Sequence, residues 1–129
     1  MPGLEKREAC AAGTKPSPLY SQSLIVGEMV YLSGITGVDW ATGDLVGGTV
    51  ADRTRQVLRN ASQILEASGS DMSKVVRVNI FLTSMKNYSA MNEVYAATFS
   101  QGTKPVRTCV AVAELPRGTD VEIEITATL

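Results

Sequence analysis

Three charged residues stand in this sequence where a small domain normally builds its core. Arg107 opens the apolar stretch VRTCVAVAEL, and Glu122 and Glu124 alternate with apolar residues in VEIEITA. A guanidinium can hold a small carboxylate with two parallel hydrogen bonds. A nearby glutamate can orient a water molecule or deprotonate it. These residue types therefore favour a reaction in which water attacks a small carboxylic acid.

The alternation of side chains along a β-strand predicts which face of the sheet each of these residues occupies. The two stretches read as β-strands: Arg107–Ala113 and Val121–Ala127. In the first, Arg107 shares a face with Cys109 and with small alanines, which leave space beside the guanidinium. In the second, Glu122 and Glu124 lie opposite the apolar face. The pattern leaves a structural alternative open, in which Arg107 pairs with one of the glutamates across strands or the charged groups face solvent.

The absence of histidine from the sequence excludes several reaction types. Ser-His and Cys-His catalysis require an imidazole, and so do the common zinc sites. Cys10 and Cys109 lie far apart in the chain, which is not the spacing of a sulfur-based metal site. We therefore expect no metal site of these kinds. Cys109 is itself more typical of a small buried residue than of a nucleophile, although a nearby guanidinium lowers a thiol pKa.

Length and composition indicate a single domain over residues 1–129, with 1–18 a loop-like N-terminal segment. The chain is 44% hydrophobic and 19% charged, with a formal net charge of −1 and no basic cluster. Specific nucleic-acid binding is not expected, because phosphate contacts need clustered Lys and Arg. No apolar run is long enough to span a membrane. The N-terminus lacks a secretory signal and a clear transit peptide, so a cytoplasmic location is expected, with a mitochondrial one as the alternative.

The elements that must position these residues follow from periodicity. We expect a hairpin of Ser21–Val26 and Met29–Ile35 around a II′ turn at Gly27-Glu28, a glycine-rich loop over 36–49, a helix over 49–68, a strand Lys74–Thr83 and a helix Tyr88–Ser100. The order ββαβαββ predicts an α+β two-layer domain. The helices cover one face of the sheet, and self-association would cover the other.

The two helices carry finer signals. Apolar residues recur with helical spacing from Val50 to Leu65, Thr49 and Asp52 form a capping-box pattern, and Gly69 suits the position after the helix end. Three arginines and a glutamine are expected on its solvated face: Arg53, Arg55, Arg59 and Gln63. The second helix is expected to be capped by Asn87 and has an apolar face of Tyr88, Met91, Tyr95 and Phe99. Asn92 lies on that same face, which is unusual for an amide.

Five motifs together resemble the Rid (YjgF-like) family, and its RidA branch most closely. They are YSQSLIVGEMVYLSG, TRQVLRNASQILEASGS, VVRVNIFLTSMKNYSAMNEVYAATF, PVRTCVAVAELPRG and VEIEITA. The resemblance implies a chorismate-mutase-like fold and a homotrimer whose sheets pack into a central barrel, with sites between subunits. It also implies hydrolysis of 2-imino acids and their enamine tautomers to 2-oxo acids and ammonia, without metal or organic cofactor.

The resemblance also assigns roles by position. It makes Arg107 the residue that grips the substrate carboxylate and Glu122 the residue that holds the reacting water, with Glu124 as the rival for that role. Cys109 matches the cysteine common two residues after the arginine.

The remaining family positions are substrate-binding candidates: Tyr20, Ser33, Asn92 and Tyr95. Two residues depart from the family pattern, Leu19 and Ile35. Because both border the expected pocket, they bear on substrate breadth.

A rival function belongs to another class. A regulatory or sensor module of the same fold would bind a small carboxylate through Arg107 without using Glu122. Turnover, and its loss in a Glu122→Gln variant, separates the enzyme from the sensor.

Overall fold

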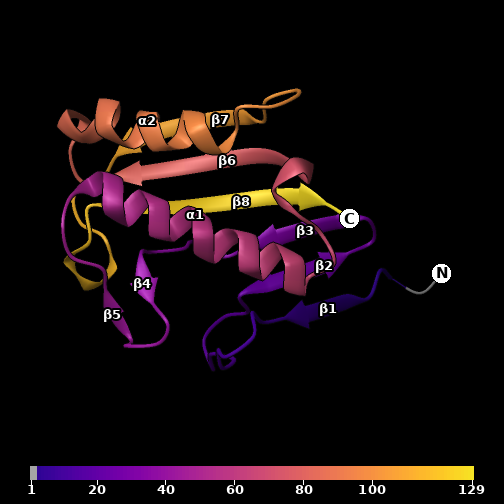
Figure 1. Ribbon diagram of the computed structural model, residues 1–129. Helices are drawn as coiled ribbons and strands as arrows, with labels where there is room; N and C mark the ends of the chain where they lie inside the picture. The colour runs from indigo at the N-terminus through magenta and orange to yellow at the C-terminus, as the bar shows by residue number, and fades with distance from the viewer. Residues whose placement is uncertain (1–2) are drawn as a thin grey trace.

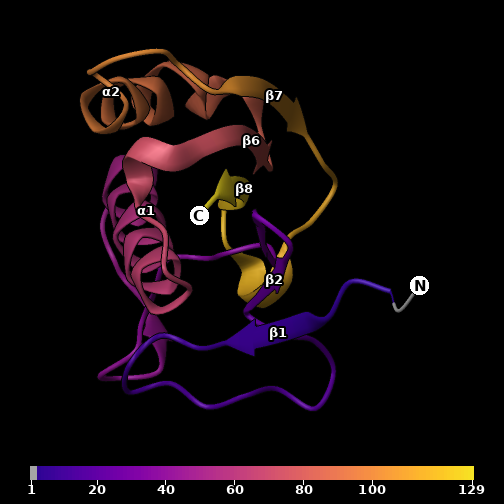
Figure 2. The same cartoon turned by 90° about the vertical axis from the view of Figure 1, so that its right-hand side faces the viewer.

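Two helices lie on one face of a six-stranded sheet in the computed structural model, which describes residues 3–129 (Figure 1). Viewed along the strands, the sheet curves around the helices and leaves its other face uncovered (Figure 2). The strand order is β1-β2-β3-β8-β6-β7, and of the strand pairs in residues 3–129 only β6–β7 is parallel. This arrangement confirms the predicted α+β two-layer fold. The elements are β1 (Lys6–Ala9), β2 (Ser23–Val26), β3 (Met29–Leu32), β4 (Val38–Asp39), β5 (Asp44–Leu45), α1 (Val50–Ala67), β6 (Val75–Leu82), α2 (Tyr88–Thr98), β7 (Val106–Ala111) and β8 (Val121–Thr128).

Strand β8 forms the centre of the sheet, between β3 and β6. Its apolar residues are fully buried toward the helices, as the alternation predicted: Val121, Ile123, Ile125 and Ala127. Glu122 and Glu124 therefore lie on the uncovered face.

Helix α1 packs on the sheet through the face that its periodicity predicted. Thr49 and Asp52 form both hydrogen bonds of the capping box. The helix ends with Gly69 at φ 86°, where the Ser70 amide donates to the Leu65 carbonyl at 2.8 Å in a Schellman arrangement. Asn60 is buried although it was not on the predicted face, and the other buried residues are those the spacing predicted: Val50, Thr54, Val57, Leu58, Ala61, Ile64 and Leu65.

Asn60 fastens the glycine-rich segment to α1. Its side-chain amide donates to the carbonyls of Thr36 at 3.2 Å and Val38 at 2.8 Å. The expectation of a plain loop over 36–49 was wrong, because strands β4 and β5 form a short hairpin inside it. The hairpin is closed by a 2.8 Å bond from the Gly43 amide to the Asp39 carbonyl.

Arg53 is not on a solvated face, contrary to expectation. Its Nε and Nη2 donate to the two carboxylate oxygens of Asp120 at 2.7 and 2.8 Å, and Nη1 donates to the Gly48 carbonyl at 3.1 Å. The segment before α1 folds over this position, so the side chain is half-buried. Arg53 thereby joins the helix to the start of β8.

The N-terminal segment is not entirely loop-like. Strand β1 pairs antiparallel with β2 at the edge of the sheet, although its side chains are mostly exposed. Residues 1 and 2 lie outside the described part of the chain. The turn between β2 and β3 agrees with the expected type II′. That type requires a positive φ at its first central residue alone, and Gly27 has φ 60° whereas Glu28 has no positive φ.

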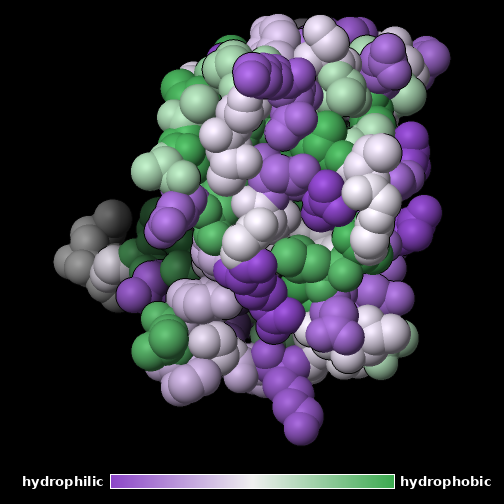
Figure 3. Space-filling view, turned by 90° about the vertical axis from the view of Figure 1, so that its left-hand side faces the viewer, coloured by the Kyte–Doolittle hydropathy of each residue, from purple (hydrophilic) through white to green (hydrophobic). Residues whose placement is uncertain are grey.

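Helix α2 is shorter than predicted and ends at Thr98. Asn87 occupies its N-cap position, but its side chain makes no capping hydrogen bond, so the expected cap was wrong. Strand β7 likewise ends at Ala111, before Ala113. At the end of the molecule where α2 begins and β6 ends, hydrophobic and hydrophilic residues are intermixed (Figure 3). Within residues 3–129, no helix has the length and hydrophobicity to cross a membrane.

Candidate active site

Arg107 reaches from edge strand β7 onto the inner side of α2. Its Nη1 donates to Asn92 Oδ1 at 2.7 Å, and its Nη2 donates to the Tyr88 hydroxyl at 3.0 Å. The guanidinium carbon lies 4.7 Å from the centre of the Tyr95 ring and 5.5 Å from that of Tyr88, close enough for cation–π attraction. This hydrogen bond explains the presence of an amide on an apolar helix face: Asn92 positions the guanidinium of Arg107.

Tyr88 is a partner of Arg107 that the sequence motifs did not single out. It precedes Asn92 by four residues and Tyr95 by seven, so helical spacing places all three on one face. That spacing was the available signal.

The guanidinium of Arg107 keeps hydrogen-bonding capacity beyond these two neutral partners. Within the described residues it forms no ion pair, so the structural alternative of pairing with Glu122 or Glu124 does not occur in a single chain. It borders a cavity of about 590 Å³ beside the C-terminal half of α2. The cavity is lined by Tyr95, Ala96, Phe99, Ser100, Lys104, Pro105 and Arg107. A carboxylate is the natural partner for such a group.

Cys109 lies two residues beyond Arg107 on the same face of β7 and packs against the core. Burial raises the pKa of its thiol, and this effect outweighs the opposing effect of Arg107. The side chain is therefore a protonated thiol at neutral pH, which is a poor nucleophile.

Glu122 is half-buried on the uncovered face of the sheet. Burial raises its pKa above the ordinary value, and the neighbouring charge of Glu124 adds to the rise. The Ile35 and Ile123 backbones pair next to it, which brings Gly34 against the carboxylate. A Cβ at Gly34 would fall 2.9 Å from Glu122 Cδ, so only glycine leaves the carboxylate where it is.

Glu124 has a different environment from Glu122. It is exposed and accepts a 3.2 Å hydrogen bond from Asn79 Nδ2. Of the two glutamates, Glu122 has the raised pKa, and its carboxylate has no hydrogen-bond partner among residues 3–129, which suits the handling of a water molecule.

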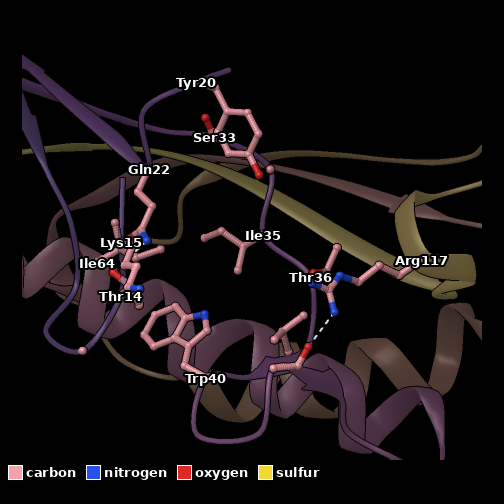
Figure 4. A pocket seen from close by; sticks show the side chains of 14 residues that line it. Thr14, Lys15, Tyr20, Gln22, Ser33, Ile35, Thr36, Trp40, Ile64 and Arg117 are labelled. Carbon is pink, nitrogen blue, oxygen red and sulfur yellow. Dashed lines mark hydrogen bonds between the residues drawn. The ribbon is translucent and has the colours of Figure 1, made fainter. Parts of the chain in front are cut away.

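Tyr20 and Ser33 line a second cavity, of about 610 Å³, together with Gly34 (Figure 4). The Ser33 hydroxyl donates to the Ser21 carbonyl at 2.7 Å, and Tyr20 is 59% exposed beside it. Ile35, one of the two departures from the family pattern, forms part of the cavity wall.

Arg107 and Glu122 point to opposite faces of the sheet. In the strand register Arg107 is paired with Val78 of β6, and Glu122 is paired with Phe81 of the same strand. Side chains alternate along β6, so partners three residues apart face opposite ways. The predicted residues thus fall into two groups. One holds Arg107, Cys109, Asn92 and Tyr95 on the helix side, and the other holds Tyr20, Ser33 and Glu122.

No cluster of three or more His, Cys, Asp or Glu side chains within residues 3–129 has the arrangement of a metal site.

Comparison with known proteins gives one consistent result. Residues 11–129 match the family model described as Endoribonuclease L-PSP. The 2-iminobutanoate/2-iminopropanoate deaminase of Mus musculus is 42% identical over 84% of this chain and 79% of its own. A Rid family protein from Yersinia pestis is 35% identical, with a TM-score of 0.91 over 97% of this chain and 100% of its own. RidA from an Antarctic Psychrobacter is also 35% identical, with a TM-score of 0.86 over 95% of this chain and 100% of its own. The chain therefore belongs to the Endoribonuclease L-PSP family, the Rid or YjgF-like family that its motifs resemble.

Proposed function

We propose that this protein hydrolyses 2-imino acids and their enamine tautomers to 2-oxo acids and ammonia. Relatives about 40% identical over most of the chain carry the name 2-iminobutanoate/2-iminopropanoate deaminase. The main support for the proposal is that the positive charge of Arg107 is not paired with a carboxylate in the described part of the chain. Its guanidinium hydrogen-bonds to an amide and a phenol, and no carboxylate within residues 3–129 forms an ion pair with it.

In the proposed reaction Arg107 binds the α-carboxylate of the substrate with charge-assisted hydrogen bonds. Glu122 orients a water molecule and accepts its proton as the oxygen bonds to the C=N carbon. The nitrogen takes that proton to give a tetrahedral carbinolamine. The proton of the new hydroxyl then passes through Glu122 to the same nitrogen, the C–N bond breaks, and ammonia leaves as the C=O bond forms. An imine carbon is already electrophilic, so lowering the barrier by a few kcal/mol gives a useful rate, about tenfold for each 1.4 kcal/mol.

We infer that a second copy of the chain brings the two groups of residues together in one site. Two side chains that point to opposite faces of one sheet cannot hold one small substrate between them. The uncovered face of the sheet also carries exposed apolar residues that a partner would bury: Tyr31, Val106 and Val110. We propose a homotrimer with its sites between subunits, in which one copy supplies Arg107 and its neighbour supplies Glu122.

The family name refers to an endoribonuclease. Nothing in the arrangement described here favours that activity, because the chain contains no histidine to act as acid or base on a phosphodiester. Small-carboxylate chemistry fits the side chains present.

The test is a coupled assay in which a threonine dehydratase generates 2-iminobutanoate, with and without this protein. Wild type should accelerate formation of the oxo acid. Arg107→Ala should lose the acceleration while remaining folded, and Arg107→Lys should restore little of it, because an ammonium cannot make the bidentate contact. Binding of 2-oxobutanoate that depends on Arg107, without turnover by wild type, would instead favour the sensor function.

The shared site has its own test. Arg107→Ala and Glu122→Gln chains, each inactive alone, are unfolded together in equal amounts and refolded. If each site takes its arginine from one copy and its glutamate from the next, about a quarter of the sites in random trimers contain both native residues. Recovered activity near that fraction supports the shared site. No recovery in mixed oligomers of confirmed composition would place both residues in one copy and contradict it.

A further inference from the structure

The cavity beside Tyr20 and Ser33 has an apolar floor and a positively charged mouth. Ile35, Ile64 and Trp40 form the floor, and Lys15 and Arg117 stand on either side of it (Figure 4). Of the described residues that line this cavity, none carries a carboxylate. Its volume of about 610 Å³ lies within the range of small-molecule sites.

Arg117 has a backbone conformation that its residue type disfavours. Its φ and ψ are 60° and 13°, the following Gly118 has φ 69°, and the Thr119 amide donates to the Pro116 carbonyl at 3.2 Å. These values describe a turn of type I′, in which Asn or Gly is usual at the position of Arg117. The turn alone does not account for an arginine, and strain of this kind is concentrated at ligand-binding positions.

The side chain of Arg117 is held over the cavity by a neutral group. Its Nη1 donates to the Gly43 carbonyl at 2.6 Å, and within the described residues the guanidinium forms no ion pair. The remaining N–H groups are left for a ligand.

Lys15 is placed on the opposite side by a fixed N-terminal segment. The Gln22 side chain accepts from the Ala11 amide at 3.0 Å and donates to the Thr14 hydroxyl at 2.8 Å. This anchor holds the backbone that carries Lys15, whose ammonium also forms no ion pair within residues 3–129. Two cations thus face one cavity without compensating charge.

We propose that Arg117, assisted by Lys15, selects substrates whose side chain ends in a negative charge. The inference rests on the proposed function and on Gly34, which lines this cavity and also packs on Glu122. A substrate carbon presented to Glu122 directs its side chain past Gly34 into the cavity. The apolar floor contacts the methylene groups, and the guanidinium binds a terminal carboxylate. The imino acid formed from a dicarboxylic amino acid is the class that fits, and 2-iminoglutarate is the probe.

The experiment compares kcat/KM for 2-iminoglutarate and 2-iminobutanoate in wild type, Arg117→Asn and Lys15→Gln. Asn suits the turn, so Arg117→Asn should melt at the same temperature as wild type or higher. We expect its ratio of kcat/KM, dicarboxylic over monocarboxylic, to fall at least tenfold, with a smaller fall for Lys15→Gln. Arg55→Gln removes the same charge from exposed helix surface and should leave the ratio unchanged.

A ratio that stays at the wild-type value in Arg117→Asn overturns the inference while leaving the proposed function intact. If wild type turns over neither imine, the proposed function fails, and calorimetry with the oxo acids decides the inference separately. Preferential binding of 2-oxoglutarate over 2-oxobutanoate that Arg117→Asn abolishes upholds the anionic side-chain site. Equal binding of the two oxo acids by wild type overturns it.

Discussion

Asn92 accepts a 2.7 Å hydrogen bond from Arg107 and so fixes the guanidinium against α2. The amide oxygen is a neutral acceptor, which orients the arginine without cancelling its charge. A carboxylate at the same place would hold Arg107 as well but would neutralise it, and a substrate carboxylate would then have to compete with it. Replacing the Asn92 amide with a carboxylate therefore tests whether the uncompensated charge of Arg107 binds the substrate.

Asn92→Asp should impair substrate binding although it changes the side chain very little. The new carboxylate forms an ion pair with Arg107, so KM for 2-iminobutanoate should rise about tenfold or more, with a smaller change in kcat. Steady-state kinetics at pH 7 measures both constants, and the melting temperature should not fall. Unchanged KM would mean that Arg107 does not bind the substrate.

Gly34→Ala should reduce activity through Glu122. The added Cβ would overlap the Glu122 carboxylate, which must move to accommodate it. Gly34 has no positive φ, so alanine causes no backbone strain there and the fold should persist. We expect kcat to fall about tenfold, since a small misplacement of a water-handling group is costly. Gly47→Ala, at a glycine with no side chain within 4 Å and no positive φ, is the matched control. Full activity of Gly34→Ala would argue against a role for Glu122.

Sequence periodicity correctly predicted the elements whose structure depends on signals within a single segment of the chain. Helix α1 has a complete capping box, a glycine stop and a continuous apolar face, and it formed as expected. Strand β1 was not predicted. It lies at an exposed edge and is held by backbone hydrogen bonds to β2, so its side chains need no apolar alternation that the sequence could reveal. Arg53 was misplaced because its partner, Asp120, lies 67 residues away in the sequence.

The candidate site shows the same division. The family resemblance named both Asn92 and Tyr95 as candidates for the substrate site, and in the structure both contact Arg107. The opposite orientation of Arg107 and Glu122 depends on how β7 and β8 both align with β6, which no single strand reveals. Arg117 gave no signal in the sequence, because its role follows from a backbone conformation rather than from a motif.

The Arg53–Asp120 ion pair should contribute to stability at neutral pH and lose that contribution in acid. The two hydrogen bonds from Arg53 lower the pKa of Asp120 below its ordinary value. Since the folded-state pKa is the lower one, the contribution is complete above the unfolded-state pKa, near 3.8, and disappears as pH falls through the folded-state value. Arg53→Gln should therefore lower the free energy of unfolding at pH 7 by about 1–2 kcal/mol.

Arg55→Gln is the control for this pair, because Arg55 pairs with Asp52 on exposed helix surface and should matter little. Denaturant unfolding of both variants at pH 7 and pH 3 gives the comparison. A loss for Arg53→Gln that is equally large at pH 3 would show that packing, rather than the ion pair, is responsible.

Glu122 should destabilise the folded chain at neutral pH, with the opposite sign to Asp120. Burial and Glu124 raise its pKa above the ordinary value of 4.5, so the ionised carboxylate is disfavoured in the folded state. This penalty is complete above the folded-state pKa and disappears as pH falls toward 4.5. Glu122→Gln should accordingly raise the melting temperature at pH 7, have little effect on it near pH 4, and abolish turnover at pH 7. Glu124→Gln should retain most of the turnover, because the Glu124 carboxylate is exposed and hydrogen-bonds to Asn79. Melting curves from pH 4 to pH 8, beside coupled turnover of both variants, provide the test. A Glu122→Gln variant that melts lower than wild type at pH 7 would show that the carboxylate gains a cationic or hydrogen-bonding partner in the assembled protein.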